Sequence, residues 1–124
     1  MIMEIRQVCH PEAVRRFSTE ELRRHFLIER IFSPGEVVLT YSHIDRLVVG
    51  GAMPSKERLV LPTPNAVGTD AFMKRRELGI INTGGVGRVV VGGTTHELAH
   101  RDAMYVSKEA GDVAFESANA EKPA

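Results

Sequence analysis

The chain has 124 residues, 43% of them hydrophobic and 26% charged, which is enough to bury one hydrophobic core and ordinary for a globular domain. Sixteen basic residues balance sixteen acidic ones, so the composition gives no support to nucleic-acid binding. No apolar run approaches the ~18 residues of a membrane span, and the single Cys9 cannot form an internal disulfide. We therefore expect a cytoplasmic protein with neither nucleic acid nor membrane as a partner.

The first predicted element is a short helix over Thr19–Phe26. Ser18 and Glu21 have the spacing of a capping box, in which each side chain bonds an amide group at the start of the helix. Leu22 and Phe26 are four residues apart and fall on one face. The pattern indicates one short N-terminal helix with an apolar face.

Short segments rich in β-branched residues then alternate with turn residues, as is typical of strands. The predicted strands cover residues 27–32, 36–41, 44–49 and 59–61. Ser33-Pro34-Gly35 ends the first of them and Gly50-Gly51 ends the third. The proline-rich residues 62–70 form the longest loop, which is too short to separate two domains, and residues 72–76 lead out of it.

Residues 77–117 alternate short apolar runs with glycines, so we predict an antiparallel meander with tight turns. About eight or nine short strands at regular spacing favour a mainly β fold, and among such folds a jelly roll built as a double-sheet sandwich or barrel. We expect one domain over residues 1–117, followed by a polar C-terminal tail over residues 118–124.

The segment from His96 to His100 (HELAH) matches the pattern with which two histidines bind zinc from one face of a helix. Here the pattern follows valines and glycines that are typical of a strand and a turn. On a strand, which rises ~3.3 Å per residue, the two histidines would lie roughly 13 Å apart, whereas zinc–nitrogen bonds are ~2 Å long. We therefore predict that both histidines are outward polar side chains on a strand.

Residues 77–117 resemble the cupin family, whose jelly-roll domains carry two metal-binding motifs. Glu77 and Gly84 match the end of the first motif. The two histidines that normally precede this glutamate would fall at Ala71 and Met73, or at Asp70 and Phe72. In the second motif Ser107 replaces a proline and Asp112 stands near the place of a histidine. The resemblance implies a cupin-like domain without its metal site.

Three further blocks resemble 5-keto-4-deoxyuronate isomerase, also called 4-deoxy-L-threo-5-hexosulose-uronate ketol-isomerase. They are YSHIDRLVVGG at 41–51, RRELGIINTGG at 75–85 and HRDAMYV at 100–106. That family has two cupin-like halves and interconverts 5-keto-4-deoxyuronate and 3-deoxy-glycero-2,5-hexodiulosonate during pectin breakdown. Its zinc lies in the C-terminal half, on histidines and a glutamate. The resemblance implies that this chain is the N-terminal half and binds no cofactor itself.

An acidic sugar substrate requires a cation for its carboxylate, and arginine binds carboxylates as a bidentate fork. Isomerisation also needs a base near the reacting carbon. The candidate contacts with substrate or with an interface are His43, Asp45, Arg46, Arg75, Arg76 and Asp102, with His100 and Arg101 beside the last. The alternative is a turn role for these residues, with an Arg101–Asp102 ion pair and with Glu77 paired to Arg75 or Arg76 at a strand end.

Three functions remain open at this point. The chain could be the N-terminal half of the isomerase, incomplete for catalysis alone. It could be a complete isomerase with a site formed across an oligomer interface, or a non-enzymatic sugar-binding or assembly module. Because sheet faces that pack on a second half would be exposed, we expect homo-oligomers or association with a C-terminal cupin half.

Overall fold

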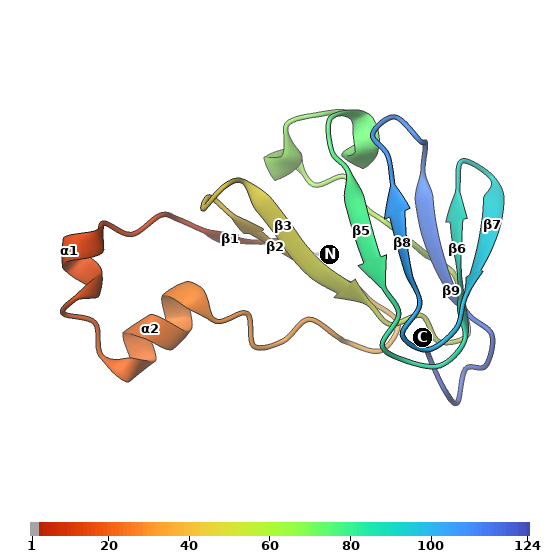
Figure 1. The fold of residues 1–124 in the computed structure, drawn as a ribbon, viewed down its shortest axis with the longest axis horizontal. Helices are drawn as coiled ribbons and strands as arrows, with labels where there is room; N and C mark the ends of the chain where they lie inside the picture. Colours follow the sequence, from red (N-terminus) through yellow and green to blue (C-terminus); the bar gives the residue numbers. More distant parts are fainter. Residues whose placement is uncertain (1–2) are drawn as a thin grey trace.

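The computed structural model describes residues 3–124, which form a β body with a long N-terminal projection (Figure 1). The helices are α1 (Pro11–Val14) and α2 (Thr19–Phe26), with 3₁₀ helices at Asn65–Val67 and Phe72–Lys74. The strands are β1 (Met3–Arg6), β2 (Val37–Ser42), β3 (Leu47–Ala52), β4 (Leu59–Val60), β5 (Leu78–Ile81), β6 (Gly87–Val91), β7 (Thr94–Leu98), β8 (Ala103–Val106) and β9 (Val113–Ser117). The predicted mainly β class is confirmed.

The strands form three sheets, with the orders β1-β2-β3, β4-β9-β6-β7 and β5-β8. In the C-terminal half the pairs are nested around one hairpin: β6 pairs with β7, β5 with β8, and β4 with β9, all antiparallel. The hairpin turn is Gly92-Gly93, where both residues have positive φ angles of 52° and 84°, as a two-residue turn requires.

The predicted meander is therefore wrong in its pairing, although its strands are antiparallel as expected. Between β5 and β9, only β6 and β7 are neighbours both in sequence and in a sheet. Leu78 of the β5–β8 sheet and Val89 of the four-stranded sheet lie on apolar faces that line the same cavity. Because the chain crosses between sheets, the two apolar faces oppose one another and are both buried. The buried core comprises Leu39, Val67, Phe72, Met73, Val89, Leu98, Val106 and Val113.

The third strand is displaced from its predicted position. Residues 43–46 form a turn, in which Asp45 and Arg46 have left-handed φ angles of 55° and 53°, so β3 begins at Leu47. Gly50 and Gly51 therefore lie inside β3. A Cβ would come within 2.2 Å of the Val38 carbonyl at Gly50 and within 2.3 Å of the Ile31 carbonyl at Gly51. Their role is close backbone packing, and they do not end the strand.

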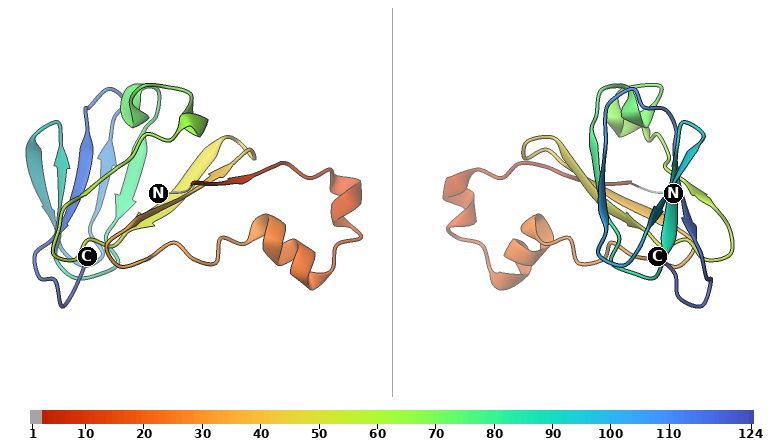
Figure 2. Two further views of the ribbon diagram at one scale, coloured as in Figure 1. Left: turned by 180° about the vertical axis from the view of Figure 1, so that it is seen from behind. Right: turned by 45° about the vertical axis from the view of Figure 1, so that its right-hand side comes forward.

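Residues 7–33, which we call the arm, leave the body after β1 and return before β2 (Figures 1 and 2). The predicted α2 is confirmed with both bonds of its capping box, but α1 is a second helix, capped by His10. The predicted strand over residues 27–32 is wrong, since this segment is the irregular returning limb of the arm. No residue of the arm is buried.

The C-terminal tail folds back against the body. The Gly85 amide donates to the Pro123 carbonyl at 2.9 Å, and the Ala124 amide donates to the Ser117 hydroxyl at 2.8 Å. Ala124 is half-buried against Gly87. Within residues 3–124, no helix has the length and apolar character needed to cross a membrane.

Candidate functional site

Four side chains gather beside the end of β2, and we call them the arginine–tyrosine cluster: Tyr41, His43, Arg46 and Arg76. The guanidinium carbon of Arg76 lies 5.3 Å from the centre of the Tyr41 ring, a cation–π geometry. Arg76 Nη1 also donates to the Arg46 carbonyl at 3.2 Å. The His43 ring also lies against the Tyr41 ring, with 4.9 Å between the two ring centres. The structure thus brings together three of the predicted site residues.

The cluster combines a fixed cation with two polar rings. Tyr41 is only 7% exposed and holds Arg76 in place, whereas His43 and Arg46 are exposed to solvent. Arg76 uses one of its five N–H groups in the bond to Arg46, which leaves donors for a carboxylate. Tyr41 was not predicted as a site residue, although it opens the first block that resembles the isomerase family.

Two further predicted residues flank the cluster without joining it. Asp45 occupies the exposed turn before β3, and Arg75 is exposed next to Arg76. Neither takes part in an ion pair among residues 3–124. Their charges are therefore available to a ligand or to a partner surface.

Glu77 does not pair with Arg75 or Arg76, contrary to the prediction. Its carboxylate takes part in none of the ion pairs among residues 3–124. Hydrogen bonding with Glu77, followed by desolvation and the negative charge of Glu77, raises the pKa of Tyr105 above its ordinary value of 10.0.

Asp102 lies at the opposite end of β5 from the cluster. Arg76 and Asn82 are six positions apart, and the Asn82 amide donates to the Asp102 carbonyl at 2.9 Å, so the two sites are roughly 20 Å apart along extended backbone. The Asp102 carboxylate accepts from the Ala99 amide at 2.9 Å and closes a turn. The predicted ion pair with Arg101 is absent from the described ion pairs, because this carboxylate already has a backbone partner.

Asn82 organises that end of the body and was missed as a key residue. It is 7% exposed. Its Nδ2 donates to the carbonyls of Gly85, Leu98 and Ala99 at 2.7, 2.9 and 3.2 Å. Its Oδ1 accepts from the Gly84 amide at 3.0 Å. One amide side chain thus joins the loops before β6 and after β7, and the only sequence signal was its place before a glycine turn.

His96 and His100 do not form a zinc site with each other. His96 is an exposed residue of β7, as predicted, but His100 lies beyond the strand in the following turn, where its Nδ1 is 2.9 Å from the Gly84 carbonyl. The prediction that both lie on one strand is therefore wrong for His100, because β7 ends at Leu98. Among residues 3–124, no three His, Cys, Asp or Glu side chains are close enough to share a metal ion.

The positions that correspond to cupin metal ligands do not suit zinc either. Phe72 and Met73 are 7% and 3% exposed and belong to the hydrophobic core. Asp70, at another of these positions, pairs with Lys74 at 2.7 Å. Two side chains of the hydrophobic core and a carboxylate paired with a lysine do not supply the three or four convergent ligands that zinc requires.

An interior cavity of about 410 Å³ lies between the β2–β3 hairpin and strands β5, β6 and β9. Its wall is mainly apolar, with Arg88 and Glu116 as charged members. Glu116 also pairs with Arg58, with Oε1 2.6 Å from Arg58 Nε, so this charge is already balanced. The volume suits a small ligand, but none of the predicted site residues lines it.

Comparison with known proteins finds relatives that share one protein name. No protein-family profile matches the chain. A protein of Bacillus pumilus named 4-deoxy-L-threo-5-hexosulose-uronate ketol-isomerase is 50% identical over 120 residues, which are 97% of this chain and 44% of that protein. Proteins with the same name from Halalkalibacterium halodurans and Pectobacterium carotovorum are 45% and 44% identical over 98% of this chain.

The chain thus spans just under half the length of these relatives, 44–45% of each. The matched part includes both the arginine–tyrosine cluster and the Asn82 turn, since nearly all of the chain is aligned. The resemblance predicted from the sequence is confirmed: over almost its whole length, this chain is homologous to a half-length portion of the 4-deoxy-L-threo-5-hexosulose-uronate ketol-isomerases.

Proposed function

We propose that the chain is the N-terminal half of a cytoplasmic 4-deoxy-L-threo-5-hexosulose-uronate ketol-isomerase and is incomplete for catalysis alone. The observation that carries this proposal is identity of 44–50% over 97–98% of the chain but over only 44–45% of the relatives. The reaction moves a proton between adjacent carbons and needs a base and an electrophile. A zinc ion held by the other half would supply the electrophile.

The same proposal includes a single cupin-like domain over residues 1–117, in which strands β2 to β9 form the jelly roll. A jelly roll is a long antiparallel hairpin rolled into two facing sheets. The nested pairs β6–β7, β5–β8 and β4–β9 have that order, with the strands shared between two sheets. In the additional β1-β2-β3 sheet, Val37 and Leu39 of β2 and Val48 of β3 also line the cavity. This topology supports the proposed family of folds.

In this proposal the half described here contributes structure, and its arginine–tyrosine cluster contributes a cationic surface. Arg76 is fixed against Tyr41 and keeps donors for a carboxylate. A uronate or an acidic surface of the second half would each offer such a carboxylate. Isomerisation itself would take place on the zinc-bearing half.

The test is an isomerase assay on the 124-residue chain, with and without added zinc, alongside the full-length Bacillus pumilus relative. We expect no turnover by the chain alone under either condition. A chimera, in which this chain replaces the matching 44% of that relative, should restore turnover. Zinc-dependent turnover by the isolated chain would contradict incompleteness, and a folded, zinc-loaded but inactive chimera would contradict the family role.

The cluster also supports a second candidate, the binding of a sugar acid without turnover. The specific observation is that Arg76 and the exposed His43 both lie against the ring of Tyr41. Titration of galacturonate into the chain should shift the Tyr41 and His43 ring signals, and Arg76→Leu should abolish the shifts. Arg75→Leu, a change of the adjacent exposed arginine, is the matched control; shifts lost equally in both variants would indicate non-specific attraction.

A further inference from the structure

The interior cavity reaches into the hydrophobic core of the body. Its wall includes four core residues that are each at most 7% exposed: Leu39, Phe72, Val89 and Leu98. Other apolar side chains of the wall are only half-buried, among them Leu78, Ile80 and Phe115. Folded proteins contain few voids larger than a water molecule, so a space of about 410 Å³ between these side chains is more than ordinary packing leaves.

The charged residues of the wall point away from the cavity. Val89 of β6 and Phe115 of β9 are cross-strand partners on the inner face. Because side chains alternate between the two faces of a strand, the neighbouring pair Arg88 and Glu116 lies on the outer face. There Glu116 also pairs with Arg58, at 2.6 Å from its Nε. Arg88 and Glu116 therefore contribute no charge to the interior.

The polar groups of the wall are already engaged. Asn82, the buried polar residue of the wall, makes four hydrogen bonds with backbone groups. Within residues 3–124, no buried side-chain nitrogen or oxygen lacks a hydrogen-bond partner. A water molecule needs about two to four polar partners to remain in a cavity, and a sugar would leave its hydroxyl groups unpaired there. The cavity therefore suits an apolar occupant.

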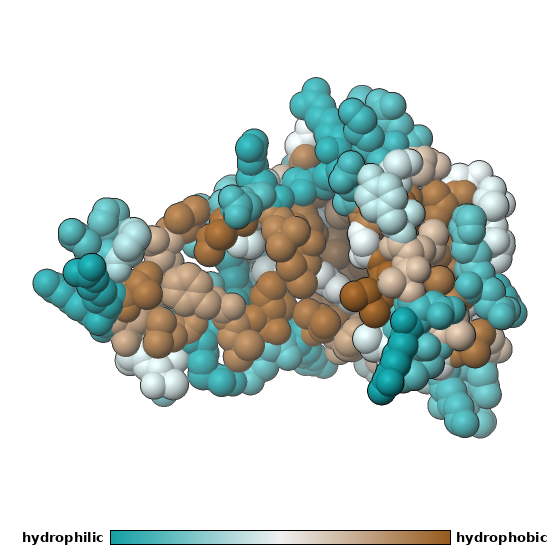
Figure 3. Space-filling model, viewed as in Figure 1, coloured by the Kyte–Doolittle hydropathy of each residue, from teal (hydrophilic) through white to brown (hydrophobic). Residues whose placement is uncertain are grey.

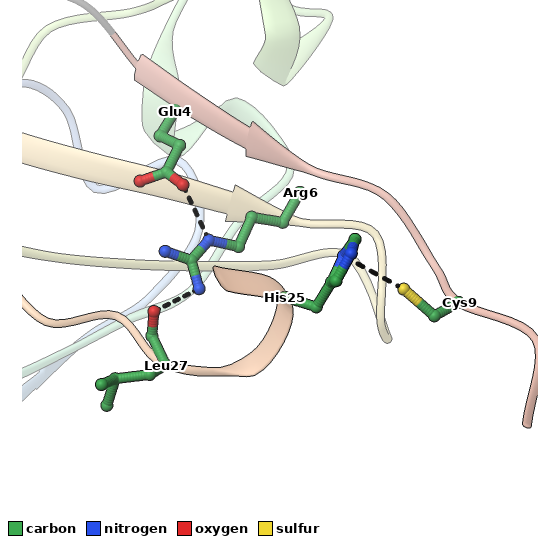
Figure 4. A network of polar contacts seen from close by, with 5 residues as sticks. All are labelled: Glu4, Arg6, Cys9, His25 and Leu27. Carbon is green, nitrogen blue, oxygen red and sulfur yellow. Dashed lines mark hydrogen bonds and ion pairs between the residues drawn. The ribbon is translucent and has the colours of Figure 1, made fainter. Parts of the chain in front are cut away.

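The returning limb of the arm forms one side of the cavity. Figure 3 shows apolar surface that runs along the arm and the β2–β3 hairpin to a hollow beside β5. Ile31 and Phe32 of this limb belong to the wall. The limb is tied to β1, because Arg6 donates through Nη1 to the Leu27 carbonyl (Figure 4). The wall is thus formed by the folded chain itself, as is usual for small-molecule sites.

We propose that this cavity binds one small, uncharged, apolar molecule, of the size of two fused rings or a comparable aliphatic chain. An apolar cavity of about 150 Å³ holds benzene, so a cavity of about 410 Å³ has room for a larger hydrocarbon. The site is separate from the arginine–tyrosine cluster, none of whose side chains lines it. The proposal rests on the cavity alone and does not depend on the isomerase proposal.

Naphthalene, a two-ring hydrocarbon, is the probe for the first test. In an NMR titration of the 124-residue chain, the methyl signals of Leu39, Ile80 and Val89 should shift until the site is saturated. Val60 and Ile81, which are 59% and 71% exposed, are the controls and should not shift. Naphthoate, which adds a carboxylate to the same rings, should bind these methyl groups at least about ten-fold more weakly, because its charge would be buried without a partner.

Two outcomes of this titration would overturn the proposal. One is the absence of shifts in the cavity methyl signals up to the solubility limit of naphthalene. The other is an equal response of these signals to naphthoate, which would show that the cavity does not select an uncharged ligand.

A pair of tryptophan substitutions tests where the ligand lies. The chain contains no tryptophan. Ile80→Trp would fill part of the cavity, whereas Ile81→Trp places the same side chain at an exposed position of β5. Ile80→Trp should weaken naphthalene binding by about ten-fold or more and should emit at shorter wavelength than Ile81→Trp, which should bind like the unchanged chain. Equal affinities of the two folded variants would contradict the assignment of the site.

The chimera with the Bacillus pumilus relative separates a ligand site from a surface that the rest of that protein covers. In the chimera this chain is joined to the part of the relative that it does not span. Naphthalene should raise the Tm of the chimera as it raises that of the chain, since a ligand that binds only the folded state stabilises it. Binding by the chain but not by the chimera would show that the other half fills the cavity, and would overturn the proposal. The isomerase activity of the chimera, present or absent, does not enter this test.

Discussion

Replacing Asn82 by alanine should lower the free energy of unfolding more than the other polar substitutions that we predict for this chain. The side chain makes four hydrogen bonds with backbone groups, at 2.7, 2.9, 3.0 and 3.2 Å. Leu98, whose carbonyl accepts one of them, is 7% exposed. Alanine would leave that carbonyl without a donor in a place that water reaches poorly.

The magnitude follows from the burial of these partners. A hydrogen bond contributes about 0.5–1.5 kcal/mol net, and a buried group left without a partner costs about 1–3 kcal/mol. Because the Gly84, Gly85 and Ala99 groups are more accessible than Leu98, we expect a loss of about 3 kcal/mol in the free energy of unfolding. For a domain of this size that corresponds to a fall of roughly 10 °C in Tm.

Urea unfolding followed by far-UV circular dichroism measures this loss, and an unchanged m-value would show that the native state is still compact. Asn119→Ala is the matched control, since its Oδ1 accepts one exposed bond from the Glu121 amide at 2.9 Å; its effect should stay within about 0.5 kcal/mol. Equal stabilities of Asn82→Ala and Asn119→Ala would refute the role given to Asn82.

Asn82→Asp extends the test to pH. A carboxylate in this position would face the three carbonyl oxygens that now accept from Nδ2, so its pKa in the folded state should be raised. A raised pKa means that the variant is most stable below the pKa of aspartate in the unfolded chain and loses stability as the pH rises through the folded value. A variant that gains stability between pH 4 and pH 7 would contradict this geometry.

Three further predictions concern other parts of the chain. Gly51→Ala should destabilise the protein by about 2 kcal/mol or more, because the new Cβ would come within 2.3 Å of the Ile31 carbonyl, whereas Gly79→Ala has open space and should be neutral in thermal unfolding. Ser18→Ala should speed amide hydrogen exchange in α2 about five-fold, since a lost N-cap costs about 1 kcal/mol. Hydrogen bonding from the Ser18 amide lowers the pKa of Glu21, so this capping bond is present above the ordinary carboxyl pKa and is lost as the pH falls through the folded value, which the α2 amide chemical shifts would report.

The parts of the fold that depend on neighbouring residues were predictable from the sequence. The capping box at Ser18 and Glu21 forms as expected, and the Gly92-Gly93 turn joins two strands. The pairing of strands was not predictable from the sequence. Whether β5 pairs with β6 or with β8 depends on which apolar faces pack against each other in the folded chain. The sequence of residues 43–46 also resembles the start of a strand. The left-handed backbone of Asp45 and Arg46 forms a turn there, so β3 begins only at Leu47.

In the candidate site, too, the sequence indicated individual residues but not the contacts between residues that are far apart in the chain. Arg46 and Arg76 were chosen separately for their charge, yet thirty residues separate them and nothing in either segment predicts that one donates to the other. Tyr41 was passed over because an alternating strand makes an inward tyrosine look like ordinary core. Its burial at 7% and the arginine above its ring give it a second role. Resemblance to a family selected the correct blocks of sequence, and only three-dimensional structure showed which of their side chains meet.

The arm shows why an apolar pattern alone cannot name its partner. Leu22 and Phe26 were predicted to share the apolar face of a short helix, and residues 27–32 were predicted to form a strand, because both segments carry an apolar pattern. In the folded chain these segments are exposed, with Phe26 at 46% and Leu27 at 38%. Selection for burial acts on sequence in the same way whether the covering surface belongs to the same chain or to another one. The failed strand prediction and the exposed helix therefore share one physical cause, which is that both segments carry an apolar pattern that the rest of residues 3–124 does not cover.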